Sequence, residues 1–181
     1  PTAGTSNVRF GVNAGNSIAS GGIYNVLVGD EAGTAITTGD QNVAIGIEAL
    51  STATTASRNT AVGLQALKVN TGDDNSAFGY GALISNTTGT YNTAIGRSAG
   101  GAVTTGIQNT LIGGLAGDAL TDADFNVAIG YAALTNDTLG SRNVAIGRST
   151  LQDQNFSSAT NSYNTAVGYG VGAAVTTGIL N

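Results

Sequence analysis

A five-residue motif recurs along the whole chain, and this repetition restricts the possible folds more than any other feature. The motif reads Asn, then Val, Thr or Ser, then usually Ala, then Ile, Val or Phe, then Gly. Its ten copies start at intervals of 18, 17, 17, 16, 17, 17, 17, 17 and 21 residues. A repeat this short cannot hold a pair of helices, and within the motif the polarity alternates with period two, as in a strand.

The repeat predicts an all-β fold, a parallel β-solenoid of about ten coils of about 17 residues. We expect each coil to hold two short strands and two turns, and to shield the apolar row of its neighbour. At about 4.8 Å per coil, the stack would form a rod of roughly 45–50 Å. Residues 1–181 are interpreted as a single repeat domain and a fragment of a longer fibrous protein. The one long interval predicts a loop insertion at 152–160.

The fourth motif position is apolar in every copy, and we expect this row to form the structural core. The row consists of Phe10, Val28, Ile45, Val62, Phe78, Ile95, Ile112, Ile129, Ile146 and Val167. The third position is mostly Ala and would then face outward. A face kept small on every coil suggests a place where another chain approaches closely.

The asparagine that opens each copy fits a turn, where its amide can bond backbone groups and stack on the asparagine of the next coil. This predicted turn ladder consists of Asn7, Asn25, Asn42, Asn59, Asn75, Asn92, Asn109, Asn126, Asn143 and Asn164.

Composition argues against several classes of function. The net charge is −5 and the six Lys and Arg residues are scattered, so we expect no nucleic-acid partner. No apolar run approaches the roughly 20 residues of a membrane helix, so we expect no membrane insertion. The chain has no His and no Cys, and it contains no recognisable metal-ligand spacing. We therefore expect no catalytic residues, no metal and no cofactor.

Two acidic groups are weaker candidates for chemistry. Glu31 and Glu48 occupy the same repeat position one coil apart, near the carboxylate separation of a retaining glycosidase. Three aspartates within 118–124 could surround Ca²⁺, but the spacing matches no known calcium loop. For both groups, solvated side chains on turns are the favoured interpretation.

Tyr and Arg recur beside the motif, and these residue types often dominate binding surfaces. The candidate receptor contacts directly follow the motif glycine: Tyr80, Arg97, Tyr131, Arg148 and Tyr169. A second such row directly precedes the motif asparagine: Tyr24, Arg58, Tyr91, Phe125, Arg142 and Tyr163. Covering of turns or sealing of neighbouring chains is the competing explanation for both rows.

The segments "NTAIGRSAGGAVTTGIQNTLIG" (92–113) and "NSAFGYGALISNTTGTYNTAIG" (75–96) resemble the repeats of trimeric autotransporter adhesin heads. They resemble even more closely the Asn-Thr-Ala-Ile-Gly-x-x-Ala-Leu repeats of phage tail-fibre-like proteins. The resemblance covers 7–181 and implies left-handed β-rolls packed side by side as a homotrimer. We place the chain contact of such a trimer on the Ala/Gly row.

These observations favour a structural and adhesive segment of a trimeric surface fibre, extracellular, from a phage tail fibre or a bacterial adhesin. Its receptor would be a cell-surface glycan or protein. A polysaccharide-degrading tailspike is one alternative and would need a cleft with converging carboxylates. An ice-binding solenoid is another, and it would need a regular threonine array. That array is interrupted here, because Thr60, Ser76, Thr93, Thr110 and Val127 share one repeat position.

Overall fold

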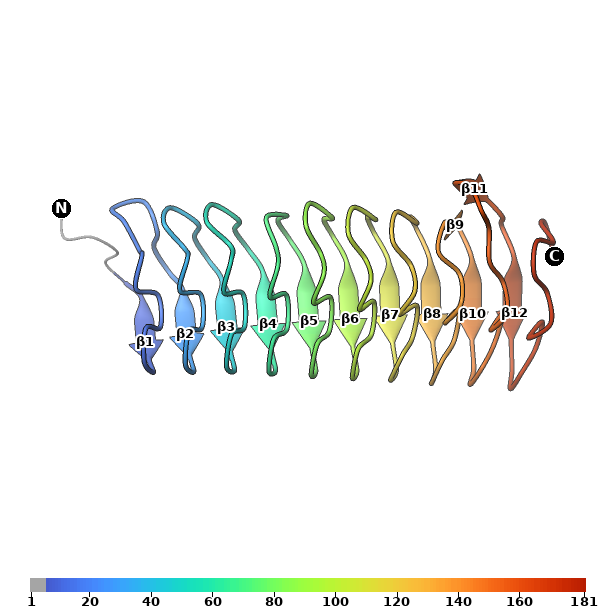
Figure 1. Cartoon of the computed structure of the whole chain (residues 1–181), viewed down its shortest axis with the longest axis horizontal. Coiled ribbons are helices and arrows are strands. Elements are labelled where there is room, and N and C mark those ends of the chain that lie inside the picture. Colours follow the sequence, from blue (N-terminus) through green and yellow to red (C-terminus); the bar gives the residue numbers. More distant parts are fainter. Residues whose placement is uncertain (1–5) are drawn as a thin grey trace.

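In the computed structural model, residues 6–181 form a straight stack of coils that is much longer than it is wide (Figure 1). Each coil is counted from the residue that precedes its motif asparagine, so coil 1 begins at Ser6 and coil 10 at Tyr163. The described residues contain strands and turns and no helix. The predicted parallel β-solenoid is therefore confirmed.

The main sheet contains ten strands of three residues, one from each coil. Their order in the sheet is β1 (Val8–Phe10), β2 (Val26–Val28), β3 (Val43–Ile45), β4 (Thr60–Val62), β5 (Ser76–Phe78), β6 (Thr93–Ile95), β7 (Thr110–Ile112), β8 (Val127–Ile129), β10 (Val144–Ile146) and β12 (Thr165–Val167). Neighbouring strands are parallel and pair at equal motif positions, as Ala77 does with Ala94. The register explains why the repeat must be regular: equivalent residues stack along the rod.

Each regular coil has one strand and not the two that we expected. In coil 3, Glu48 and Leu50 follow the strand with φ angles of 55° and 53°. These left-handed residues interrupt any extended run. The backbone of this wall still bonds the next coil, since the Leu50 N–H donates to the Ala66 carbonyl at 3.0 Å. The part of the coil where we expected a second strand is therefore made of turns.

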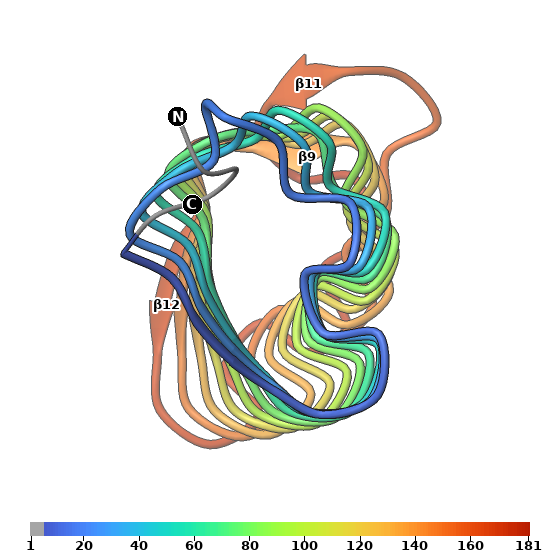
Figure 2. The ribbon, with the colours of Figure 1, turned by 90° about the vertical axis from the view of Figure 1, so that its left-hand side faces the viewer.

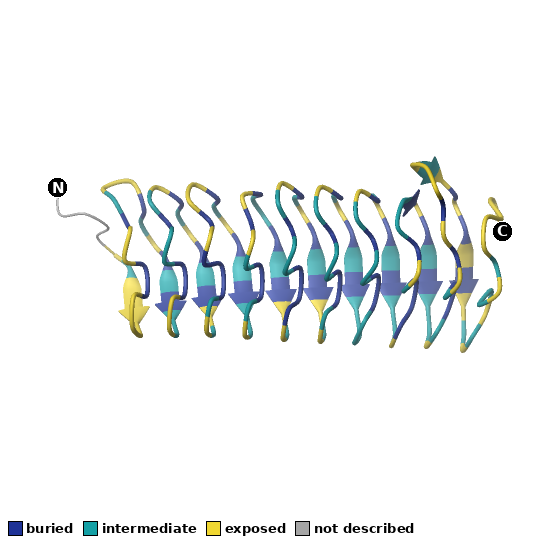
Figure 3. Ribbon diagram, viewed as in Figure 1, coloured by how far each residue is buried: buried dark blue, intermediate teal, exposed yellow. Residues whose placement is uncertain are grey.

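The inside and outside of the strands are the reverse of our prediction. Ala94 is 0 % exposed and points into the coil, whereas Ile95 is 42 % exposed and points outward. Figure 3 shows the same buried band through the middle of the strands from β2 to β12. Large side chains also enter the interior from the opposite wall, so most strands contribute alanine there, whereas β2 and β7 contribute Leu27 and Leu111. The Ala row thus lies inside each coil and cannot be a contact between chains.

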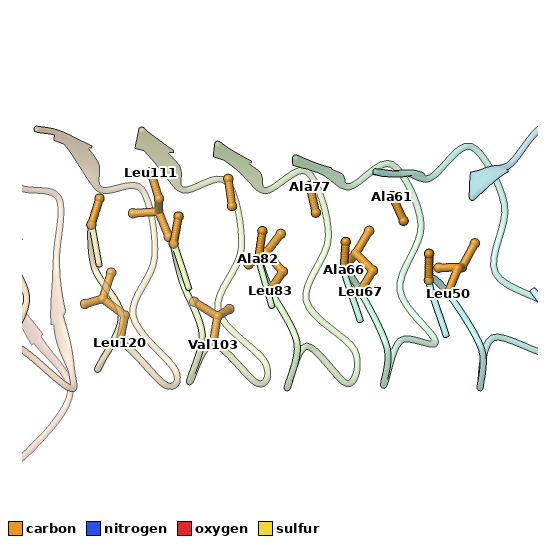
Figure 4. Close-up of a cluster of buried hydrophobic side chains, with 14 of the residues drawn as sticks. Leu50, Ala61, Ala66, Leu67, Ala77, Ala82, Leu83, Val103, Leu111 and Leu120 are labelled. Carbon is orange, nitrogen blue, oxygen red and sulfur yellow. The ribbon is translucent and has the colours of Figure 1, made fainter. Parts of the chain in front are cut away.

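On the wall opposite the strand, one position holds leucine in some coils and glycine in others, and the interior is filled in both cases (Figure 4). The fourth and seventh residues after the motif glycine vary together. Coils with glycine at the fourth position have a branched apolar residue at the seventh: Gly15/Ile18, Gly33/Ile36, Gly100/Val103, Gly117/Leu120 and Gly172/Val175. Coils with leucine have a small or polar residue: Leu50/Ala53, Leu67/Asn70, Leu83/Asn86, Leu134/Asp137 and Leu151/Gln154.

The two positions supply the same interior volume. A Cβ added to Gly33 would lie 2.8 Å from Ile36 Cδ1, and one added to Gly117 would lie 2.8 Å from Leu120 Cδ1. A leucine at the fourth position therefore cannot coexist with a branched apolar residue at the seventh. The sequence contains this compensation, although the five-residue motif does not include either position.

This compensation can be tested by exchanging the pair in coil 5. Leu83→Gly alone should destabilise the protein by about 3–5 kcal/mol, because it empties part of the core. The double variant Leu83→Gly/Asn86→Ile should recover much of this loss, since it recreates the arrangement of Gly33 and Ile36. Urea unfolding of both single variants and the double variant would measure the coupling. Strictly additive effects would show that the two positions do not share one space.

The asparagines form a continuous ladder inside the turn that precedes the strands. The Oδ1 atom of each accepts the backbone N–H of the asparagine one coil later, at 2.7–3.1 Å along the stack. In most coils Nδ2 also donates to the carbonyl that closes the coil, as Asn92 does to Gly106 at 2.8 Å. These side chains are buried from Asn25 to Asn164, and their hydrogen bonds satisfy the backbone where the strands begin.

The long interval between coils 9 and 10 produces a bulge beside the solenoid (Figure 2). β9 (Gly140–Ser141) and β11 (Thr160–Asn161) pair in parallel there and form a second, two-stranded sheet. Phe156 is buried beneath this segment. The insertion is thus an ordered element, and it lies next to the residues that precede the motif asparagines.

Candidate functional site

The outward side of the main sheet forms a continuous surface that runs along all ten coils. We define the outer sheet face as the first and third residues of its ten strands. The third residues are the row that we predicted as core, and they remain partly exposed: Phe78 is 40 % and Val167 62 % exposed. The first residues are Val, Thr or Ser. The outer sheet face is therefore a long, mostly apolar strip without any cover in the single chain.

Two rows of larger side chains border this strip. The glycine edge is the row that follows the motif glycines, and it holds all five candidate receptor contacts in exposed positions: Tyr80, Arg97, Tyr131, Arg148 and Tyr169. The asparagine edge is the row that precedes the motif asparagines. The two edges are separated by the width of a strand and its flanking residues, at most about 20 Å.

Three of the five candidates on the glycine edge are brought together. The Arg148 guanidinium lies 5.8 Å from the Tyr131 ring centre and 5.6 Å from that of Tyr169. Arg148 Nη1 also donates to the Tyr169 hydroxyl at 3.2 Å. Tyr80 and Arg97 belong to coils 5 and 6 and are separated from this group by Gly114 of coil 7. The structure therefore supports one cluster of three, not a continuous ridge of five.

A second cluster lies on the asparagine edge of the same coils, and we call it the asparagine-edge cluster. It consists of Phe125, Arg142, Asn161 and Tyr163. The Arg142 guanidinium lies 4.5 Å from the Phe125 ring centre and 5.9 Å from that of Tyr163. Arg142 Nε donates to Asn161 Oδ1 at 3.1 Å, and Asn161 belongs to β11 of the insertion. Sequence analysis named the ring-bearing residues and Arg142 but missed Asn161, because only the fold brings it next to Arg142.

Arg58 occupies the same repeat position as Arg142 and has a different environment. Its Nε donates to Asp74 Oδ1 at 2.7 Å, and its Nη2 lies 3.0 Å from Asp73 Oδ2. The hydrogen bond from Arg58 lowers the pKa of Asp74, and the same pair raises that of Arg58. Arg58 is thus neutralised by the next coil, whereas in coil 9 aromatic rings take the place of the acids.

The carboxylates considered from the sequence serve contacts between coils. Glu48 Oε2 accepts from Lys68 Nζ at 2.8 Å and from Gln65 Nε2 at 2.7 Å, and these bonds lower the pKa of Glu48. Glu31 takes no part in this group. Within 118–124, Asp118 accepts from the Thr135 hydroxyl and Asp124 from the Ile107 N–H at 2.8 Å. No three acidic residues in 6–181 converge on a common point that could hold a metal ion.

The described surface has no pocket. Residues 6–181 also contain no helix that is long and apolar enough to cross a membrane. No protein-family model, curated protein or solved structure matches the chain. The surface features above are therefore the basis for inferring function: an apolar strip along the sheet, and two arginine clusters at its borders.

Proposed function

We propose that this chain is a structural and adhesive segment of a trimeric, extracellular fibre, in a phage tail fibre or a bacterial surface adhesin. The observation that carries this proposal is the outer sheet face, an uncovered apolar strip that runs from β1 to β12. Contiguous exposed apolar surface of this kind marks a site of association. The proposal of three chains per fibre rests on the resemblance of the repeats to trimeric adhesin heads and tail-fibre repeats.

The geometry suits association side by side. The strip lies on one straight wall and runs along the rod, so a second rod of the same chain can cover it over its full length (Figure 1). Ile45, Ile95 and Ile129 present branched side chains at the same strand position of three coils along it. Burial of such residues contributes about 25 cal/mol per Å² of apolar area. We therefore place the contact between chains on the outer sheet face, and not on the Ala row, which is inside the coil.

The two alternative functions have less support. A tailspike enzyme would need a cleft with converging carboxylates, and Glu48 is instead held by Lys68 and Gln65. An ice-binding face would need an even array, and the third strand position contains Phe10 and Phe78 between smaller residues. These features agree better with a stiff structural segment that separates other parts of a fibre or presents binding surfaces on it.

Measurement of mass in solution tests the proposal. Light scattering and native mass spectrometry of the intact protein should give three chains per particle. Ile95→Asp, which places a charge on the outer sheet face, should shift the protein toward monomer. Thr88→Asp is the control, because Thr88 is exposed outside the sheet and the change should preserve the trimer. A stable monomer for the unaltered protein would overturn the fibre proposal.

A further inference from the structure

We propose that the asparagine-edge cluster binds a carboxylate of an acidic polysaccharide, with Arg142 as the anion-binding residue. This inference names a partner for the adhesive part of the proposed function and rests on it for its biological role. The cluster itself is built by one chain, so the binding step can be tested separately from the number of chains in the fibre.

Arg142 has hydrogen-bonding capacity left for a ligand. Its Nε is used by Asn161, whereas Nη1 and Nη2 have no acceptor among the described residues. The bond to Asn161 fixes the plane of the guanidinium. A planar guanidinium with free N–H groups recognises a carboxylate through two parallel hydrogen bonds.

The charge of Arg142 is also uncompensated. The ion pairs of residues 6–181 involve Arg58 and Lys68, and none involves Arg142. Asp124 is the acid next to Phe125 in sequence, and its Oδ1 accepts from the Ile107 N–H. Because the whole chain carries a net charge of −5, general attraction of polyanions is not expected. Binding of an anion here must therefore come from the local cluster.

Two aromatic rings make a sugar the best-fitting carrier of that carboxylate. Phe125 and Tyr163 belong to the coils on either side of Arg142, and both are exposed. The Arg142 guanidinium covers part of these rings, and the ring surface that stays exposed is flat and apolar, so the C–H face of a pyranose ring can stack on it. An acidic peptide would instead need pockets for anchoring side chains, and the described surface has none.

The insertion ties this site to coils 8–10. β11 places Asn161 against Arg142, and β9 and β11 occur only at this end of the described chain. Loops that depart from a repeat often carry its binding function. At the equivalent position of coil 4, Arg58 lacks such a loop and is paired with Asp73 and Asp74 instead.

Isothermal titration of the intact protein with a galacturonate tetrasaccharide tests the site. Binding should be measurable, and it should weaken at least tenfold with the methyl-esterified tetrasaccharide, which lacks the charge. Arg142→Gln should weaken binding by at least tenfold. Arg58→Gln is the matched control at the same repeat position and should change affinity less than twofold. Circular dichroism and particle mass of each variant would show whether fold and assembly persist.

Three results would overturn the assignment. One is the absence of binding by a correctly assembled protein, which would leave the fibre proposal intact. A second is equal affinity for tetraglutamate, which would indicate an acidic peptide in place of a glycan. The third is loss of binding in Arg148→Gln but not in Arg142→Gln, which would place the site on the glycine edge. Conversely, uronate binding by a monomeric protein would support the binding site and would contradict the proposed trimer.

Discussion

Ala94→Asp is expected to abolish folding of the coil stack, whereas Ile95→Asp, one residue later, should leave the single chain folded. Ala94 is 0 % exposed and belongs to the buried apolar core, where a carboxylate would have no partner. Burial of an unpaired charge costs several kcal/mol, and the whole stability of a domain is only about 5–15 kcal/mol. Ile95 points outward, so a carboxylate at that position would remain in water.

Circular dichroism and thermal melting of the two variants decide between the two orientations of the strand. Ala94→Asp should lack the β-sheet signal and a cooperative transition. Ile95→Asp should retain both, although its particle mass should fall as the outer sheet face loses its contact. Normal melting of Ala94→Asp together with an unfolded Ile95→Asp would show that the row of Ile95 is the interior after all.

The repeat was sufficient to predict the solenoid, its register and the asparagine ladder. Each of these depends only on equal positions recurring at equal spacing, which can be counted in the sequence. The orientation of the strand was predicted wrongly because we assumed that the larger apolar row must be internal. Size alone does not decide this, since the interior is filled from two walls and the opposite wall supplies Leu50, Leu67 and Leu83.

The compensation inside the coils was present in the sequence and could have corrected the orientation. Every glycine at the fourth position after the motif glycine occurs with a large apolar residue three positions later, as in Gly33 and Ile36. Such an exchange of volume between two positions is expected only of residues that share a packed core. It identifies the wall opposite the strand as interior, and the row of the strand that faces this wall is then the mostly alanine row, with Leu27 and Leu111 in two coils.

The environment of each arginine was partly predictable in the same way. Parallel register places residue n beside residues about 17 earlier and later, so Arg58 is expected beside Asp74 and Arg142 beside Phe125. Contacts across the insertion were not predictable, because the longer interval breaks this rule. The bond between Arg142 and Asn161 therefore required the structure.

Gly96→Ala should destabilise the stack severely, as should the same change at the other motif glycines, with a loss of at least about 3 kcal/mol. The φ angle of Gly96 is 137°, a conformation that residues with a side chain rarely adopt. A Cβ on Gly96 would lie 2.6 Å from the carbonyl carbon and oxygen of Gly113 in the next coil. Backbone atoms in register cannot move aside individually, so the clash must open the stack.

Gly81→Gln provides the control, because Gly81 also has a positive φ, 61°, but has room for a Cβ. The nearest atom to an added Cβ is Ser98 Oγ at 3.9 Å, and Gln65 occupies the same repeat position with φ 59°. Its cost should be about 1 kcal/mol, the ordinary penalty of left-handed backbone. Urea unfolding of the two variants compares the two kinds of position. A much larger loss for Gly96→Ala would show that its φ of 137° and its close contact with the next coil together require glycine, and equal losses would contradict this prediction.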